Sequence, residues 1–584
     1  MPRHGWTGAA LGAALWLTLT PHPGAAQDYQ RIAPRAPQAA PAPPVTAPAP
    51  PPPAPAADVV LLPALRGLVF VPDPSAVQAG GIAPATLPKD GILATGLPLL
   101  GDPGFTAQLA PFLGQKLRFA DLQQIERLTT AFYSAHDRPF VAVTAPPQNV
   151  SSGVVQIVVS EYRVGDVTVA GNRWFAAELL ARESGLTPGE KLTLSGVQAD
   201  LDWLNANPFR RVEAQFQPGR TAGTTDVVLN TQDRLPVRVY ASFDEAGAPS
   251  LGRGEWSTGA TWGNVAGLDQ TLSYQFTRSL TGQYDAHSLS WSVPLPWRDK
   301  LSIFGSYARE TPDVPRFGET GDTGQASIRY VDTLPPQAIG TGLALTHNLA
   351  LGYDFKTSNN NLEFGGTRVF TSSSEIDQFP LIYDATLTDP YGQTALENQL
   401  VLSPGGITGA NTTKLFSASV PGATADYAYD RIGLTRTTFL PKGFSWSSRV
   451  VGQLSDRNLL DSEQLGAGGP DSVRGYFTDT ALGAKGVLVS EELRGPAFSL
   501  SEWLHGPVSD MVQPGLFWDY AHVAQVRTIP DAVNSADLSS LGVDLHATLD
   551  RYVDVTFNLG WQQRPAPGSD KRGAFGTLAV IVGY

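Results

Sequence analysis

Apolar and polar residues alternate strictly along many short segments in the C-terminal part of this chain. The period of two is clearest at 541–549 and 553–561, and it recurs at 272–276 and 289–293. Because successive side chains of a β-strand point to opposite faces, each segment predicts a strand with one apolar and one polar face. Aromatic residues near the strand ends of the apolar face, with small polar residues on the other, are typical of a membrane barrel around a wet lumen. The barrel must be closed, since only closure leaves no unpaired backbone in lipid.

The alternating region has the length of a large barrel. Residues 235–584 accommodate about 16 antiparallel strands at roughly 20–22 residues per strand with its connection. The rhythm breaks between 356 and 425, where Lys356–Asn361 is polar and Gly405–Asn411 is rich in turn residues. We expect parts of this stretch to form long surface loops. The mean hydropathy of −0.10 argues against a bundle of transmembrane helices.

The N-terminus has the pattern of an export signal. Arg3 and His4 precede an apolar stretch at 8–19, and small residues at 24–26 offer a cleavage site. This pattern predicts a secretory signal peptide at 1–26, with a short membrane anchor as the alternative. Residues 27–58 follow as a semi-rigid tether, because most of them are Pro, Ala and Val and favour polyproline II.

The net charge and the cysteine content limit the compartment and the class of partner. The chain contains no Cys and carries a net charge of −13. The absence of Cys fits an exported protein, and the acidic balance argues against a nucleic-acid partner, which requires a basic surface.

Two small α+β domains are predicted between the tether and the barrel, at 59–162 and 163–234. In the first, an amphipathic helix at Phe119–Ala135 lies between strand candidates, which are 65–71, 140–144 and 154–160.

The second domain repeats this order, with a strand at 167–169, a helix at 174–183, a further helix capped by Ser195, and a hairpin of 211–216 with 226–229. An exposed sheet edge in such a domain can bind an extended peptide as an added strand, and the alternative is that both domains are spacers.

Two short motifs near the C-terminus suggest an ion pair inside the barrel. Val473-Arg474-Gly475-Tyr476 follows a glycine-rich approach, and about forty residues later a strand contains Phe517-Trp518-Asp519-Tyr520. Strand parity places Phe517 and Asp519 on the lumen face, opposite Trp518. If the Arg474 loop folds inward, Arg474 and Asp519 can form a bidentate pair. Spacing alone leaves open a solvated Arg474.

These motifs resemble those of the two-partner secretion transporters, the filamentous-haemagglutinin and haemolysin exporter family. The likeness covers nearly all of residues 60–584. It includes two polypeptide-transport-associated (POTRA) domains before the barrel, the segment Asn207–Gly219 and the first barrel strand at Pro236–Asp244. The resemblance implies a transmembrane β-barrel of about 16 antiparallel strands in the bacterial outer membrane, preceded by two periplasmic α+β POTRA domains.

The resemblance also implies roles for particular residues. Arg474 and Asp519 would lock the loop, with packing support from four motif residues, Val473, Gly475, Tyr476 and Phe517. The POTRA domains would bind the unfolded secretion signal of a large exoprotein, an adhesin or a cytolysin, and deliver it to the pore. The final strand, with Val580, Val582 and Tyr584 on one face, resembles the signal read by the barrel-assembly machinery and faces outer-membrane lipid.

Two departures and several alternatives accompany this reading. Ala521 stands where the family strand usually has Gly, and Gln27–Ala33 is too short for a full N-terminal plug helix of the family's type. The main alternative is an assembly factor of the same superfamily that inserts other barrels, and a solute porin is a more distant one. We expect no enzyme, cofactor or metal, since no catalytic motif is present, and His546 on the lumen face is expected to be structural.

Overall fold

The computed structural model describes residues 27–35, 37, 39, 42–45, 59–221, 223–314, 317–339, 342–364, 367–506 and 508–584. The predicted signal peptide at 1–26 and part of the predicted tether lie outside these residues. The described chain forms two compact units. The barrel unit contains α1 (Gln27–Ile32), Arg238–Trp262 and Thr271–Tyr584, and the other unit contains Pro37–Val237 and Gly263–Gln270.

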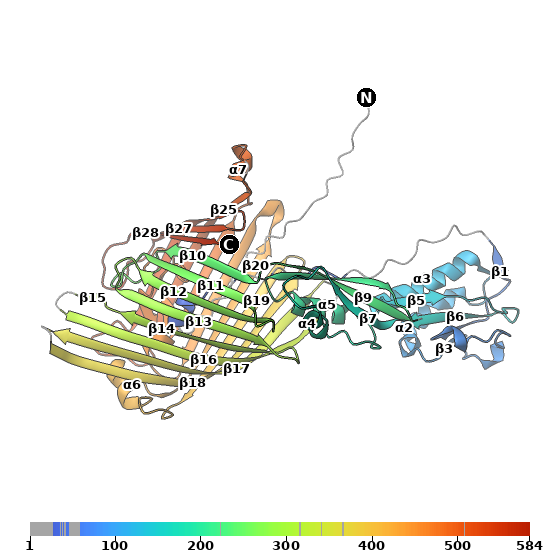
Figure 1. Cartoon of the computed structure of the whole chain (residues 1–584), viewed down its shortest axis with the longest axis horizontal. Helices are drawn as coiled ribbons and strands as arrows, with labels where there is room; N and C mark the ends of the chain where they lie inside the picture. Colours follow the sequence, from blue (N-terminus) through green and yellow to red (C-terminus); the bar gives the residue numbers. More distant parts are fainter. Residues whose placement is uncertain are drawn as a thin grey trace. The chain divides into compact units, whose positions relative to one another are not determined.

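The barrel unit is a closed antiparallel sheet of sixteen long strands, as the alternation predicts (Figure 1). The strands are β10 (Val237–Asp244), β11 (Glu255–Val265), β12 (Gln270–Ser279), β13 (Tyr284–Pro294), β14 (Lys300–Glu310), β16 (Phe317–Ala338), β17 (Ala344–Phe364), β18 (Thr367–Asp389), β19 (Gly392–Pro404), β20 (Asp426–Phe439), β21 (Ser445–Ser455), β24 (Lys485–Arg494), β25 (Asp510–Ala524), β26 (Ser535–Leu549), β27 (Val553–Gln562) and β28 (Ala574–Gly583). The first and last strands close the barrel, with Tyr240 opposite Gly583.

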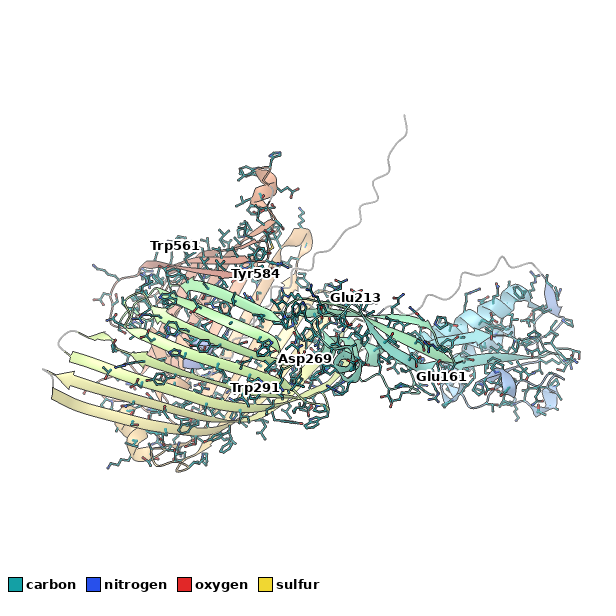
Figure 2. All side chains as sticks on the ribbon, viewed as in Figure 1. Glu161, Glu213, Asp269, Trp291, Trp561 and Tyr584 are labelled. Carbon is teal, nitrogen blue, oxygen red and sulfur yellow. The ribbon has the colours of Figure 1, made fainter. Side chains whose placement is uncertain are left out.

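The predicted face of each alternating strand is confirmed. On β25, Leu516 and Trp518 are 57% and 38% exposed, whereas Phe517, Asp519 and Ala521 between and beyond them are buried. Trp291 and Trp561 are likewise exposed on β13 and β27 (Figure 2). In a barrel the exposed set faces lipid and the buried polar set faces the lumen.

The prediction that parts of 356–425 form long loops is confirmed only for the connection between β19 and β20. Residues 356–361 belong to β17, which continues to Phe364 and pairs with β18 as far as Thr367. The strands β16 to β18 are 22, 21 and 23 residues long. A strand needs only about 9–11 residues to cross the hydrocarbon layer, so their outer parts need no apolar face and lose the alternating signal. Gly405–Asn411 does lie outside the strands, and α6 (Thr413–Ser419) follows it.

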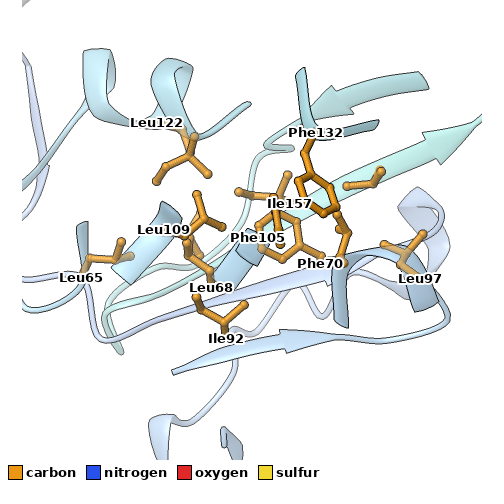
Figure 3. Close-up of a cluster of buried hydrophobic side chains, with 14 of the residues drawn as sticks. Leu65, Leu68, Phe70, Ile92, Leu97, Phe105, Leu109, Leu122, Phe132 and Ile157 are labelled. Carbon is orange, nitrogen blue, oxygen red and sulfur yellow. The ribbon is translucent and has the colours of Figure 1, made fainter. Parts of the chain in front are cut away.

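The first of the two N-terminal domains has a sheet in the order β3 (Ile92–Ala94), β2 (Gly67–Val71), β6 (Val154–Glu161) and β5 (Val141–Thr144). Two helices, α2 (Pro103–Leu109) and α3 (Phe119–Ala135), cover it, and α3 has the predicted bounds. Their apolar faces share one core with the sheet, in which Phe70, Phe105 and Phe132 are in ring contact (Figure 3). The strand β3 was not predicted.

The second domain has the predicted order, with a sheet of β7 (Arg163–Ala170), β9 (Thr224–Asp233) and β8 (Arg210–Pro218) and the helices α4 (Ala177–Glu183) and α5 (Leu194–Leu204). The predicted cap Ser195 is wrong. Thr193 has the extended backbone of a cap and accepts a hydrogen bond from the Gly196 amide. Ser195 lies inside the helix, and its hydroxyl donates to Asp137 instead.

The remaining elements are short. Besides the short 3-10 helices, they are β1 (Val60–Leu62) paired with β4 (Leu117–Arg118), β15 (Asp313–Val314) paired with β16, β22 (Leu465–Ala467) paired with β23 (Ala481–Gly483), and α7 (Leu500–Trp503) between β24 and β25. Figure 1 labels β1, β15 and α7. Among the residues that the structure describes, no helix combines the length and apolarity needed to span a bilayer.

Candidate functional site

The connection between β21 and β24, residues 456–484, lies against the lumen face of the barrel wall, and we call it the lumen loop. It begins with the short 3-10 helix η6 (Asp461–Glu463), continues through β22, and returns through β23. Near its tip, Val473 and Tyr476 are at most 1% exposed. Val473 packs with Val451 and Ala521, which come from the wall strands β21 and β25. The loop that contains the Val-Arg-Gly-Tyr motif is therefore folded inward.

Arg474 and Asp519 form the predicted bidentate pair. The Arg474 guanidinium donates through Nε to Asp519 Oδ2 at 2.8 Å and through Nη2 to Oδ1 at 2.9 Å. The backbone amide of Arg474 donates to the same carboxylate at 3.0 Å. Asp519 is 0% exposed and Arg474 is 7% exposed. The guanidinium carbon lies 3.6 Å from the centroid of the Phe517 ring, which is close enough for a cation–π contact.

Two further wall residues complete the shell around this guanidinium. Glu492 Oε2 accepts from Arg474 Nη1 at 2.7 Å, and Ser490 Oγ accepts from Nη2 at 3.1 Å. A buried pair adds little net stability over an apolar substitute, but the loss of one partner costs about 3–5 kcal/mol because the other charge stays buried. The arrangement therefore fixes the position of the loop tip more than it stabilises the barrel.

Gly475 brings the loop backbone directly onto the wall. Its φ is 86°, and a Cβ at this position would lie 2.9 Å from the carbonyl carbon and oxygen of Gly560 on β27. Gln562 Nε2 donates to the Gly475 carbonyl at 2.8 Å. The neighbouring Tyr476 hydroxyl lies 2.9 Å from the carbonyl oxygen of Ser539 and 2.6 Å from that of Arg564. The six predicted motif residues thus gather at one place, although their role as a lock stays a prediction.

Sequence reasoning missed Glu492, Ser490, Gly560 and Gln562. Gly560 and Gln562 are small or polar residues at lumen-facing positions of an alternating strand, where nothing distinguishes them from their neighbours. Glu492 belongs to no recognised motif. The only usable signal was strand parity, which would have placed each of them on the lumen face without naming its partner.

The short helix α1 also lies against the inner wall. Ile32 is 2% exposed and packs with Leu251 and Tyr284, and its carbonyl accepts from Gln275 Nε2 at 3.1 Å. Arg31 pairs with Glu255 at 2.8 Å, and Arg35 pairs with Asp244 at 2.9 Å. The helix has six residues, which make barely two turns. It is therefore much shorter than a full plug helix, as the sequence predicts.

The C-terminal residues lie on the outer face. Val582 and Tyr584 are 49% and 75% exposed, and the Tyr584 ring stacks on Tyr552 with centroids 6.0 Å apart. Val580 pairs with Phe243 across the closing seam.

His546 has the structural partner that was expected, since its Nε2 lies 3.1 Å from Asp554 Oδ2. Within the described ranges, no three or more His, Asp or Glu side chains gather in a way that could hold a metal ion.

A closed sixteen-stranded barrel, a loop tied inside its lumen, and two small α+β domains before it define an outer-membrane barrel with N-terminal POTRA domains. The family model of the haemolysin secretion/activation protein ShlB/FhaC/HecB matches residues 223–530, and the model of the ShlB-type POTRA domain matches residues 90–161. The first match covers more than half of the chain, which therefore belongs to this family of two-partner secretion transporters.

Relatives and solved structures agree with this assignment. The outer membrane transporter CdiB of Dickeya dadantii (strain 3937) is 25% identical over 69% of this chain and 71% of its own length. The heme/hemopexin transporter protein HuxB of Haemophilus influenzae (strain 86-028NP) is 20% identical over 75% of this chain and 76% of its own. CdiB from Escherichia coli has the same fold, with a TM-score of 0.70 at 18% identity and coverage of 91% and 92%. CdiB from Acinetobacter baumannii gives a TM-score of 0.60 at 15% identity, with coverage of 91% of each chain.

The family assignment decides between the readings that the sequence left open. The protein is an outer-membrane transporter that exports a partner protein, and it is not an enzyme. The assembly-factor and porin alternatives are set aside on this ground.

Proposed function

We propose that this transporter holds its pore shut with the lumen loop and opens it when the loop tip leaves the wall. The observation that carries the proposal is the buried Arg474–Asp519 pair, which ties the tip to β25. The loop tip, which the Arg474 side chain fixes, has two discrete arrangements, tied and released. An incoming polypeptide that competes for the lumen favours the released one. Val473, Gly475, Tyr476 and Phe517 support the tied arrangement by packing and close approach.

The POTRA domains, which we assign to 59–162 and 163–234, capture the partner before export. Each sheet has an edge strand with one described neighbour, β5 in the first domain and β8 in the second. Such an edge presents free backbone donors and acceptors, so an extended segment of the partner can add to it as a strand. The partner is a large exoprotein, an adhesin or a cytolysin, and its folding outside the cell drives export.

The remaining segments bring the transporter to its place. A signal peptide at 1–26 directs the chain to the periplasm. Of the predicted tether at 27–58, residues 27–35 pack in the barrel unit instead, so the tether of the first POTRA domain is the Pro- and Ala-rich remainder. The barrel at 235–584 is inserted by the barrel-assembly machinery, which reads Val580, Val582 and Tyr584. The exposure of Val582 and Tyr584 supports this, because a recognised side chain must be accessible.

The lock is tested by complementing a deletion strain with full-length variants. Arg474→Gln and Asp519→Asn are each expected to open the resting pore, seen as at least a tenfold lower tolerance of a large antibiotic that the intact outer membrane excludes, because each removes the ion pair that ties the loop tip to β25. Asp537→Asn is the matched control, since Asp537 is a partly exposed carboxylate at the end of the neighbouring strand β26. Heat-dependent gel migration verifies that each barrel is folded. Wild-type antibiotic tolerance in both lock variants would refute the proposal.

A further inference from the structure

The N-terminal limb of the lumen loop, residues 456–464, has an anchor of its own, about ten residues before Arg474 and on other wall strands. Glu463 is 0% exposed, and its carboxylate accepts four hydrogen bonds. Lys356 Nζ donates to Oε1 at 2.5 Å, Tyr429 Oη to Oε2 at 2.9 Å, and Gln378 Nε2 to Oε2 at 3.1 Å. The fourth donor is the adjacent Ser462. A loop carboxylate is thus held by β17, β18 and β20.

The backbone of the same residue is also held by the wall. The Glu463 carbonyl accepts from Gln453 Nε2 at 3.1 Å and from Arg431 Nη2 at 3.3 Å. Lys356 and Arg431 are both buried. A fully hydrogen-bonded buried charge stays where its partners are, since any displacement leaves several of them unsatisfied. Glu463 therefore fixes the limb in position as well as in orientation.

The two anchors share no residue and belong to separate packing clusters. Arg474 contacts β24 and β25, whereas Glu463 contacts β17, β18, β20 and β21. Leu460 beside Glu463 packs in a cluster with Phe416 and Tyr427, and Val473 packs in another with Ala521 and Leu538. Groups without shared contacts behave almost additively, so the release of one anchor leaves the other closed.

We propose that Glu463, held by Lys356, Gln378 and Tyr429, is a second latch of the lumen loop and the fixed pivot about which its tip moves. When the Arg474–Asp519 pair opens, the limb at 456–464 stays on the wall, and the tip leaves it together with Leu465 and Ala467, which share its packing cluster. The consequence for export rests on the proposed function, but the latch itself is a property of the purified protein. Glu463 is a positioning residue in this account.

The chain has no Cys, so single introduced thiols can report on each limb separately. Leu460→Cys, at a site that is 6% exposed, reports on the limb, and Val473→Cys, at a site that is 0% exposed, reports on the tip. Maleimide labelling rates are measured on the full-length protein in detergent, without cargo. Glu463→Gln is expected to raise the rate at position 460 at least tenfold and the rate at 473 less than twofold. Asp519→Asn is expected to do the reverse.

Three further variants keep the test decisive. Arg436→Gln breaks an ion pair with Asp389 that joins two wall strands, and it should leave both labelling rates within twofold. Tyr429→Phe removes one donor and should raise the rate at 460 by about two- to fivefold even if Glu463→Gln fails to fold. Combining Lys356→Gln with Glu463→Gln removes both charges of the Lys356–Glu463 pair, so the labelling rate at 460 in the double variant should be at least tenfold below the product of the two single effects.

Equal changes at positions 460 and 473 in either single variant would overturn the second latch, because the loop would then move as one body. An unchanged rate at 460 in Glu463→Gln and in Tyr429→Phe would overturn it as well. The antibiotic-tolerance assay on the same variants gives a separate outcome: unchanged tolerance with separated labelling refutes the gating role and leaves the latch standing.

Discussion

The sharpest stability prediction concerns Glu183, at the end of α4 in the second POTRA domain. Arg210, whose side chain is 0% exposed, holds Asp269 through two hydrogen bonds of 2.5 and 2.8 Å. Glu183 Oε2 lies 3.7 Å from the same guanidinium, beyond hydrogen-bond distance. Burial, followed by the neighbouring charge of Asp269, raises the pKa of Glu183 to about 8, while the charge of Arg210 opposes the rise.

The sign of the pH effect follows from this pKa. A carboxyl whose pKa is higher in the folded than in the unfolded chain stabilises the fold most at a pH below its pKa in the unfolded chain. For Glu183 that pKa is 4.5, and the stabilisation is lost as the pH rises to about 8. Without solvent screening, this pKa shift would lower the free energy of unfolding by about 4.8 kcal/mol, at 1.36 kcal/mol per pKa unit. Partial solvent screening reduces the loss to about 1–3 kcal/mol. The second domain should therefore lose stability between pH 4.5 and 8.

Glu183→Gln removes the titration and keeps the shape of the side chain. Hydrogen exchange of the full-length protein in detergent, followed in peptides of β8 and β9 and corrected for the intrinsic pH dependence, measures local opening. We expect the two proteins to exchange similarly at pH 5, and the variant to be protected about 5- to 150-fold better at pH 9. Equal pH slopes in the two proteins, or better protection of the wild type at pH 9, would refute the reasoning.

Three other substitutions test separate contacts. Gly475→Ala should raise thiol labelling at the loop tip and lower antibiotic tolerance, because its Cβ meets the Gly560 backbone, whereas Gly568→Ala has a similar positive φ with open space around it and should change neither. Arg210→Met should destabilise the second POTRA domain by about 3–5 kcal/mol in hydrogen exchange, since it leaves the Asp269 carboxylate without its cation, while Arg211→Met at a half-exposed pair should cost under about 1 kcal/mol. Tyr584→Ala should lower the amount of folded barrel in the membrane. Tyr552→Ala removes the same ring stacking but keeps Tyr584, so it should leave the amount of folded barrel near the wild-type level. Equal folded-barrel levels in Tyr584→Ala and wild type would contradict the assembly signal.

The parts of the fold that follow local rules could be predicted from the sequence. Strand parity alone placed Asp519 on the lumen face, and the apolar period of Phe119–Ala135 gave the bounds of α3. The cap at Thr193 was missed because Ser195 has the same preference for a cap, and backbone conformation decides between them.

The rest of the site depends on contacts that no local pattern encodes. Lys356 lies in a polar stretch that suggests a loop, yet it sits on a long strand and pairs with Glu463, 107 residues away. Gly560 matters only because Gly475 approaches it from another segment of the barrel unit. Such partners emerge when the barrel closes and the lumen loop folds inward, so a motif can identify Arg474 without identifying what surrounds it.

The most direct test of the central claim is to delete the gene in its native host and compare the secreted proteins with the outer-membrane proteome. An exporter predicts that one large extracellular protein disappears from the medium while other outer-membrane barrels stay at normal levels, and that the wild-type gene restores it. A fall of several unrelated barrel proteins, with no single exported protein lost, would contradict the account and favour an assembly factor.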